Sequence, residues 1–392
     1  MEERGNPVVE MRGIWKYFPS TDVQANRNVD FSAHAGSIHA IVGENGAGKT
    51  TLMNILYGLH RPDRGEILVD GEAVEFSSPA DAIGKGIGMV HQHFKLVPTF
   101  TVTQNILLGM EPQAAGFLNP GKEERLVRGL MDAYGLPVDP KARIDDLPVG
   151  MQQRVEILKS LQRNTRILLL DEPTAVLTPQ EVRELFGVLR RLSEEGRTII
   201  LITHKLPEVM ALADTVTVMC GGEVRARMPV ADTNLEELAG HMVGRKVVFR
   251  VEKGPCRPGN PVAEVSGLVV AGTGGAQAVS GVSFTVRRGE IVGIAGVNGN
   301  GQSELAEALS GTRPVELGEI RLLGEDITGD SVARRRNDGI ACIPEDRMHT
   351  GLNLETTLDE NVVVTRYRGS EFSRFLMMKS GAISRLARKI AD

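Results

Sequence analysis

A glycine-rich segment at positions 43–51 carries the clearest chemical signal in the sequence. Its residues are Gly43, Glu44, Asn45, Gly46, Ala47, Gly48, Lys49, Thr50 and Thr51. The first eight fit the pattern GxxxxGK[ST], in which glycines let backbone N–H groups close around phosphate oxygens. In such a loop Lys49 can reach the terminal phosphates and Thr50 offers a hydroxyl to Mg²⁺. The segment therefore predicts a phosphate site, although the string alone also fits an ordinary glycine-rich turn.

Two adjacent carboxylates, Asp171 and Glu172, follow the apolar run at 167–170. The carboxyl end of a parallel strand is where ligands bind in open α/β sheets. At that place Asp171 would hold Mg²⁺ through water, and Glu172 could polarise an attacking water as a general base. The simpler alternative is an acidic turn between a strand and a helix.

Two further polar residues also follow apolar runs. His204 comes directly after residues 199–203, and Gln92 follows residues 88–90. Either residue alone would more simply be a surface or satisfied core side chain. Because they accompany a phosphate loop and an acidic pair, we expect both to lie at the same edge of one sheet.

The apolar pattern provides the elements that would position these groups. Residues 37–43, 166–171 and 198–203 predict buried strands, and a helix is expected over about 48–58. Residues 178–196 predict an amphipathic helix, with Thr178 as N-cap in a capping box. Apolar strands separated by helices indicate an α/β fold with a parallel sheet covered on both faces.

An internal repeat divides the chain. Residues 29–92 align without a gap with residues 282–345, at an offset of 253, and about twenty of these positions carry the same residue. The proline- and glycine-rich segment 251–261 reads as a linker. We therefore expect a first domain over 1–250, the linker 251–261, and an incomplete second copy over 262–392.

Composition excludes several classes of protein. A length of 392 residues predicts two or more domains, and 45 Lys+Arg against 50 Asp+Glu argues against a protein that coats nucleic acid. The cysteines Cys220, Cys256 and Cys342 are too far apart for a zinc site or a disulfide framework. The apolar runs are shorter than a membrane span, so membrane association is expected only through a partner.

Taken together, these segments resemble the ATP-binding subunits of ABC transporters over essentially the whole chain. The resemblance implies an ATPase with a RecA-like P-loop core, an antiparallel β subdomain and a helical subdomain inserted at about 93–160. The segments that carry it are the loop at 43–51 (Walker A), Gln92 (Q-loop), residues 167–174 (Walker B), residues 175–178 (D-loop), His204 (switch histidine) and the segment from Leu147 (signature).

The resemblance also implies roles for individual residues. Glu172 would be the catalytic base, Lys49 and His204 would stabilise developing charge, and Gln92 would complete the catalytic set. Phe18, rather than Tyr17, would stack on adenine. The implied Mg²⁺ ligands are Thr50, Gln92 and Asp171, and Gly150 would contact the nucleotide held by a partner cassette.

Within the family, the tandem arrangement resembles importers of simple sugars and nucleosides, most closely the nucleoside-type branch. The implied partners are membrane permease subunits and an extracytoplasmic solute-binding protein, with no nucleic acid. The implied location is the cytoplasm, on the inner face of the membrane. We expect a permease to dock on apolar side chains after Gln92, although subdomain core is an equal alternative for each of Phe94, Leu96, Val97 and Phe100.

The sequence departs from the family pattern at both sites. In the signature, Pro148 and Met151 replace the usual serine and glutamine. In the second loop Gln302 stands where the lysine is expected, and Glu345 replaces the Q-loop glutamine. We expect the second loop to bind nucleotide and to hydrolyse it poorly or not at all. Its nucleotide-binding residues would be Gly296, Asn298, Gly299, Gly301, Gln302 and Ser303.

ABC cassettes work as head-to-tail pairs, in which the loop of one faces the signature of the other. By the offset of 253, a second signature would begin near position 400. Two interpretations follow. The sequence is a truncated form of a longer protein, which we favour, or two chains pair in trans. Rival functions are a nucleotide-binding fragment without useful turnover and, less favoured, a soluble ABC ATPase acting on nucleic acid or ribosomes.

Overall fold

The computed structural model describes residues 7–91, 94–114, 117–175, 177–243, 254, 256–272, 276–296, 299–346, 350–375 and 377–391. The chain forms two compact units, the first unit over residues 1–251 and the second unit over residues 252–392. Within the ranges given above, no helix is long and apolar enough to cross a membrane.

The first unit is built around a six-stranded sheet with the order β12-β11-β3-β10-β9-β6. All neighbouring pairs are parallel except β11 and β12. The three buried strands expected from the sequence are confirmed as β3, β9 and β10. The bounds of the six strands are β3 Ile38–Val42, β6 Ile87–Val90, β9 Ile167–Asp171, β10 Thr198–Thr203, β11 Thr215–Cys220 and β12 Glu223–Pro229.

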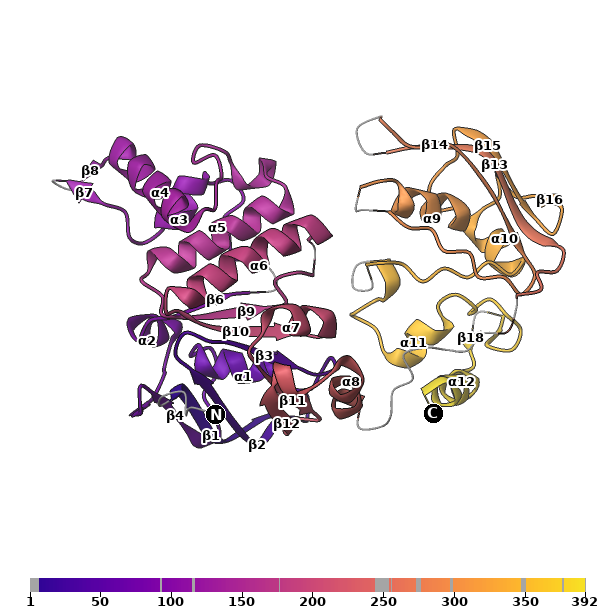
Figure 1. The fold of residues 1–392 in the computed structure, drawn as a ribbon. Helices are drawn as coiled ribbons and strands as arrows, with labels where there is room; N and C mark the ends of the chain where they lie inside the picture. Colours follow the sequence, from indigo (N-terminus) through magenta and orange to yellow (C-terminus); the bar gives the residue numbers. More distant parts are fainter. Residues whose placement is uncertain are drawn as a thin grey trace. The chain divides into compact units, whose positions relative to one another are not determined.

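Both faces of this sheet are covered, as the apolar strands predict (Figure 1). Successive side chains of a strand point to opposite faces, so Ile167 and Leu169 pack with α1 while Leu168 and Leu170 pack with α5 and α6. The helices concerned are α1 Lys49–Leu56, α5 Val149–Gln162 and α6 Pro179–Glu194, and the β11 side is covered by α7 Leu206–Leu212 and α8 Leu235–Val243.

An antiparallel sheet, β2-β1-β4-β5, and a group of helices complete the first unit (Figure 1). The sheet packs on α1 from the side opposite the parallel strands. Its strands are β1 Pro7–Phe18, β2 Val23–His34, β4 Arg64–Val69 and β5 Glu72–Val74. The remaining elements are α2 Pro79–Gly84, α3 Val102–Leu107, β7 Gln113–Ala114, β8 Phe117–Leu118, α4 Pro120–Tyr134 and short 3₁₀ turns at Ile144–Asp146 and Val230–Asp232.

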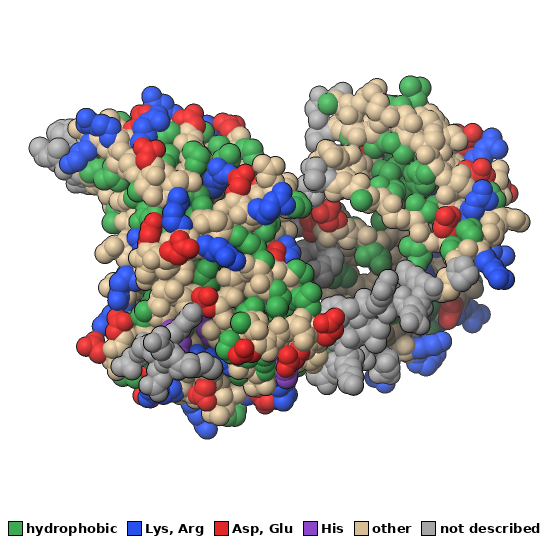
Figure 2. Space-filling view, viewed as in Figure 1, with side chains coloured by type: hydrophobic (Ala, Val, Ile, Leu, Met, Phe, Trp, Pro, Cys, Tyr) green, Lys and Arg blue, Asp and Glu red, His purple; other side chains and the backbone are tan. Residues whose placement is uncertain are grey.

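The expected start of α6 is confirmed in detail. Thr178 is the N-cap, its hydroxyl accepts from the N–H of Glu181, and the Glu181 carboxylate accepts from the N–H of Thr178. This capping box satisfies two of the backbone donors that a helix start leaves open. Figure 2 shows basic and acidic side chains interspersed over the drawn face of this unit, without a continuous patch of either sign.

The second unit repeats the antiparallel part of the first. Its four-stranded sheet β14-β13-β15-β16 follows the order of β2-β1-β4-β5, and Gly301 at φ +92° matches Gly48 at φ +92°. The bounds are β13 Pro261–Ala271, β14 Gln277–Arg287, α9 Gln302–Ser310, β15 Leu317–Leu322, β16 Glu325–Asp326, α10 Val332–Asn337, α11 Leu358–Val363, β17 Ser373–Arg374, β18 Met377–Met378 and α12 Ser380–Ala391.

Residues 291–296, the counterpart of β3, form neither strand nor helix. In the first unit β3 pairs with β10 and β11, and the described residues of the second unit form no strand that corresponds to either. Without those partners the backbone has no ladder to join, and Ile291 is 93% exposed.

A histidine lies at the centre of the parallel sheet. The Nε2 atom of His39, on β3, is 2.7 Å from Thr217 Oγ1, and its ring packs on Phe31 with centroids 4.8 Å apart. Burial, helped by the nearby Arg227 charge, lowers the pKa of His39 to about 3. An unfolded histidine titrates near 6.5, so acid protonates the unfolded chain before the folded one.

We therefore expect the first unit to lose stability on acidification because of His39. Between pH 7 and pH 5 this group removes about 2 kcal/mol from the free energy of unfolding. His39→Gln should reduce the difference in unfolding free energy between pH 7 and pH 5 by the same amount. His241→Gln, in α8 away from the sheet centre, should not reduce it. Urea unfolding at the two pH values measures it, and an unchanged pH dependence in His39→Gln contradicts it.

Candidate active site

The phosphate loop connects β3 to α1, and its backbone conformation requires glycine. At Gly48 the φ angle is +92°, and a Cβ atom there would overlap the carbonyl oxygen of Ala25. A Cβ atom at Gly43 would overlap the carbonyl oxygen of Met219, at the end of β11. The loop is thus held between β2 and β11 in a shape that side chains would prevent.

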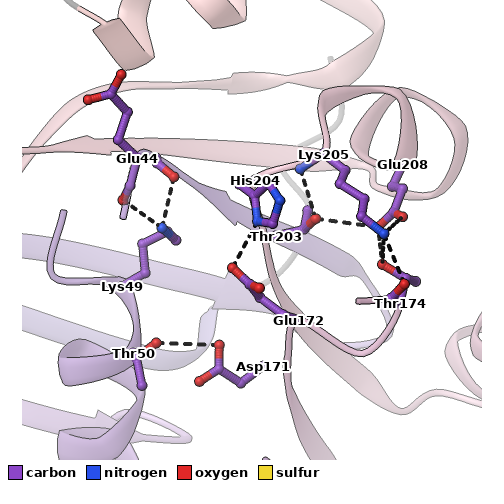
Figure 3. Close-up of polar contacts among 11 residues, drawn as sticks. Glu44, Lys49, Thr50, Asp171, Glu172, Thr174, Thr203, His204, Lys205 and Glu208 are labelled. Carbon is purple, nitrogen blue, oxygen red and sulfur yellow. Dashed lines mark hydrogen bonds and ion pairs between the residues drawn. The ribbon is translucent and has the colours of Figure 1, made fainter. Parts of the chain in front are cut away.

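Lys49 opens α1 and folds back over the loop. Its ammonium donates to the carbonyl oxygens of Gly43, at 2.8 Å, and Glu44, at 2.9 Å, and the residue is only 6% exposed (Figure 3). Burial lowers the pKa of Lys49, against the opposing effect of the Glu172 and Asp171 charges. An ammonium bonded only to carbonyl oxygens in this position is suited to exchanging them for phosphate oxygens.

Thr50 and Asp171 face each other across the first turn of α1 and the end of β9. The Thr50 hydroxyl lies 3.4 Å from Asp171 Oδ1, and Asp171 is 3% exposed. Burial is the main reason that the pKa of Asp171 is raised. A hydroxyl and a carboxylate side by side fit Mg²⁺, which takes one or two protein oxygens together with substrate phosphates.

Glu172 and His204 form the second pair of the site, as Figure 3 shows. The Nδ1 atom of His204 lies 2.9 Å from Glu172 Oε1. Glu172 has a φ angle of +47°, which is uncommon for a residue other than glycine, and its N–H donates to Ile202 O of β10. The structure therefore brings Lys49, Thr50 and these two residues to the carboxyl edge of the parallel sheet.

The signature segment leads into α5. Pro148 is the N-cap of α5 and has no side-chain hydroxyl to donate. Gly150, in the first turn, packs so closely against the Glu181 carboxylate that a Cβ atom would overlap it. Further along α5, the side-chain amide of Gln153 donates to the carbonyl oxygen of Pro173, at 2.5 Å, directly after Glu172.

The remaining predicted residues of the first unit divide into three cases. Phe18 is half-buried, edge-on to the His60 ring at 5.3 Å, whereas the Tyr17 hydroxyl donates to Asp22. Gln92 lies outside the described residues. Leu96 packs against the core beneath α5, while the other expected docking side chains are half-buried, namely Phe94, Val97 and Phe100.

The described residues of the second loop show different chemistry from the first. The side chain of Gln302 lies against Gly296 and carries no charge. The Ser303 hydroxyl is 3.2 Å from Glu345 Oε2, so a carboxylate faces the residue that corresponds to Thr50. Gly299 and Gly301 keep positive φ angles, and Asn298 lies outside the described residues.

Sequence reasoning missed a polar group beside the Glu172–His204 pair, of which all members but the half-exposed Lys205 are buried. It consists of Thr174, Thr203, Lys205 and Glu208 (Figure 3). The available signal was the i,i+3 spacing of Lys205 and Glu208 next to His204, at the start of a helix. That spacing is common on solvated helices, so it does not by itself indicate burial.

Comparison with known proteins gives a consistent result. The family model described as "ABC transporter" matches residues 26–175 and 279–390. The guanosine import ATP-binding protein NupO of Bacillus subtilis (strain 168) is 47% identical over 98% of this chain and 75% of that protein. The nucleoside import ATP-binding protein NupA of Lactococcus lactis subsp. cremoris (strain MG1363) is 44% identical over 98% of this chain and 76% of that protein.

A ribose import ATP-binding protein, RbsA 1 of Rubrobacter xylanophilus, is 41% identical over 98% of this chain and 76% of that protein. The chain thus spans about three quarters of the length of each relative.

Among solved structures, the cassette MJ1267 in its ADP conformation superposes with a TM-score of 0.54 at 23% identity. The superposition covers 62% of this chain and 100% of MJ1267. At this identity it supports only the fold of this chain. CbiO1 of Clostridium perfringens gives a TM-score of 0.52 at 26% identity, covering 61% of this chain and 95% of its own.

Proposed function

The chain belongs to the ABC transporter family, and we propose that its first unit binds Mg-ATP and hydrolyses it to drive solute import. The observation that carries this proposal is the convergence at one sheet edge of a lysine-bearing phosphate loop, the Thr50–Asp171 pair and the Glu172–His204 pair. These are the groups that phosphoryl transfer to water requires, namely phosphate donors, metal ligands and a base.

We assign the individual roles as the resemblance to the family implies them. Backbone N–H groups of the loop and the Lys49 ammonium hold the β- and γ-phosphates, and Phe18 stacks on adenine. Thr50 and Asp171, together with Gln92 as the resemblance implies, would hold Mg²⁺, which would neutralise phosphate charge. Glu172 takes a proton from a water molecule. The water oxygen bonds to the γ-phosphorus as the bond between that phosphorus and ADP breaks. His204 orients Glu172 and bonds the γ-phosphate.

The second unit binds nucleotide without efficient hydrolysis. Gln302 offers no charge to the terminal phosphates, and Glu345 adds a negative one. In the family arrangement the first loop acts opposite a signature segment of another cassette, in the same chain or in a second one. Gly150, whose backbone replaces the contacts that Pro148 lacks, contributes to the weaker partner site.

We propose nucleosides as the imported solutes, since the guanosine and nucleoside importers show 47% and 44% identity against 41% for the ribose importer. The partners are a membrane permease and an extracytoplasmic solute-binding protein. The chain works at the cytoplasmic face of the membrane, held there by the permease.

Purification of the chain together with its membrane partners tests this proposal. Reconstituted vesicles that enclose ATP on the cassette side should hydrolyse it faster when guanosine and the solute-binding protein are supplied outside, and ribose should have no such effect. Stimulation by ribose alone would move the substrate to the sugar class. ATP binding without hydrolysis would identify a nucleotide-binding fragment and overturn the proposed function.

A further inference from the structure

The buried carboxylate of Glu208 connects the two strand ends that carry the active-site pair. Glu208 lies in the first turn of α7 and is 9% exposed. Its Oε2 atom accepts from the hydroxyl of Thr174, at 2.7 Å, and from that of Thr203, at 3.3 Å. Its Oε1 atom lies 3.3 Å from the ammonium of Lys205. One side chain is therefore bonded to the segments after β9 and after β10.

Lys205 closes the connection from the other side. Its ammonium donates to the carbonyl oxygen of Thr174, at 2.9 Å, and its N–H donates to the hydroxyl of Thr203, at 3.0 Å. Both neighbours of His204 thus take part in one polar network, as Figure 3 shows. We call the four residues Thr174, Thr203, Lys205 and Glu208 the clamp.

The segment that carries Glu172 is held at successive points. The N–H of Glu172 bonds to Ile202, the carbonyl of Pro173 accepts from Gln153, and Thr174 belongs to the clamp. Glu172 has a left-handed φ angle of +47°, a conformation that persists only where the surroundings impose it. The clamp is the part of those surroundings that also holds Thr203 and Lys205, the two neighbours of His204.

A carboxylate buried at this depth is costly unless it is paired, and replacing a whole buried ion pair by apolar residues is often neutral for stability. The clamp instead satisfies both oxygens of Glu208 with two hydroxyls and one ammonium. Such a network has a directional effect that apolar packing lacks, since it fixes Thr174 relative to Thr203 and Lys205.

We propose that Glu208 is a positioning residue, which sets the Glu172–His204 pair by tying the Thr174 segment to the residues on either side of His204. The proposal rests on the proposed ATPase function, because its effect is exerted on the base of that reaction. Glu208 itself contacts neither nucleotide nor water in this account. Its role is to keep Glu172 Oε1 and His204 Nδ1 at their observed separation of 2.9 Å.

The kinetic test compares Glu208→Ala and Glu208→Gln with Glu123→Gln, a control for an equally buried glutamate in α4, 8% exposed. In the purified complex, Glu208→Ala should lower kcat about 10- to 100-fold and leave ATP affinity within about twofold. Glu208→Gln keeps an acceptor for the hydroxyls and should lie between wild type and Glu208→Ala. Glu123→Gln should match wild type.

A kcat within twofold of wild type in Glu208→Ala would overturn the proposal. So would a parallel loss of kcat and ATP affinity that Glu208→Gln does not relieve, because that pattern indicates a structural role. If the wild-type complex hydrolyses no ATP, the proposed function fails, and the positioning role is then decided by spectroscopy.

That second measurement uses the 392-residue chain with ¹⁵N-labelled histidine. The His204 resonance is identified by its absence in His204→Gln. Glu208→Ala should shift the Nδ1 resonance of His204, since its contact with Glu172 changes, while Glu123→Gln leaves it in place. An unshifted His204 resonance in a folded Glu208→Ala chain would overturn the positioning role irrespective of activity.

Discussion

Replacing Glu172 by glutamine is expected to lower ATP turnover about 10²- to 10⁴-fold with little change in ATP affinity. Glutamine keeps the size of the side chain and an oxygen for His204, but it cannot take a proton from water. The Glu172 carboxylate lies 2.9 Å from the Nδ1 atom of His204, at the edge where the phosphate loop ends. Steady-state hydrolysis by the purified complex, with ATP binding measured in parallel, separates the two quantities.

The control for this experiment is Glu195→Gln, which removes the same charge from an exposed residue just after α6. It should leave turnover unchanged. Undiminished turnover in Glu172→Gln would remove Glu172 from the chemistry. An equal loss of ATP affinity would mean that the residue shapes the loop and does not act on water.

The second large effect is expected from Lys49→Gln, which gives the first loop the residue that the second loop has at Gln302. The buried ammonium makes two bonds to loop carbonyls that phosphate oxygens can replace. A charged hydrogen bond contributes about 1.5–3 kcal/mol, so ATP affinity of the first loop should fall about 10- to 100-fold and hydrolysis should stop.

Equilibrium ATP binding measures this loss, with Lys122→Gln at the exposed start of α4 as the matched control. The reverse change, Gln302→Lys, should raise ATP affinity at the second loop without creating hydrolysis, because no described residue there replaces Glu172. Wild-type affinity in Lys49→Gln would contradict the role assigned to the ammonium.

The first unit could be predicted closely from sequence because its signals are local. The apolar run before Gly43 becomes β3, and the capping residues Thr178 and Glu181 start α6 where they were expected. The active-site residues could be grouped for the same reason. Each of Asp171, Glu172 and His204 stands at or just after the end of an apolar run, and parallel strands end at one edge.

What could not be predicted depends on contacts between distant segments. The run at 291–296 has nearly the same apolar pattern as β3, yet it forms no strand, since no described strand of the second unit corresponds to β10 or β11. The left-handed φ angle of Glu172 and the burial of Glu208 likewise arise only when β9, β10 and α7 meet. A pattern indicates what a segment is suited to form, and its neighbours decide whether it forms.

A structure of the Glu172→Gln chain with ATP and Mg²⁺ would show whether the proposed site holds the nucleotide. We expect the triphosphate over residues 43–51, bonded to the Lys49 ammonium, with the metal between the Thr50 hydroxyl and the Asp171 carboxylate. A nucleotide bound elsewhere in the first unit, or phosphates that leave Lys49 bonded to Gly43 and Glu44, would contradict it.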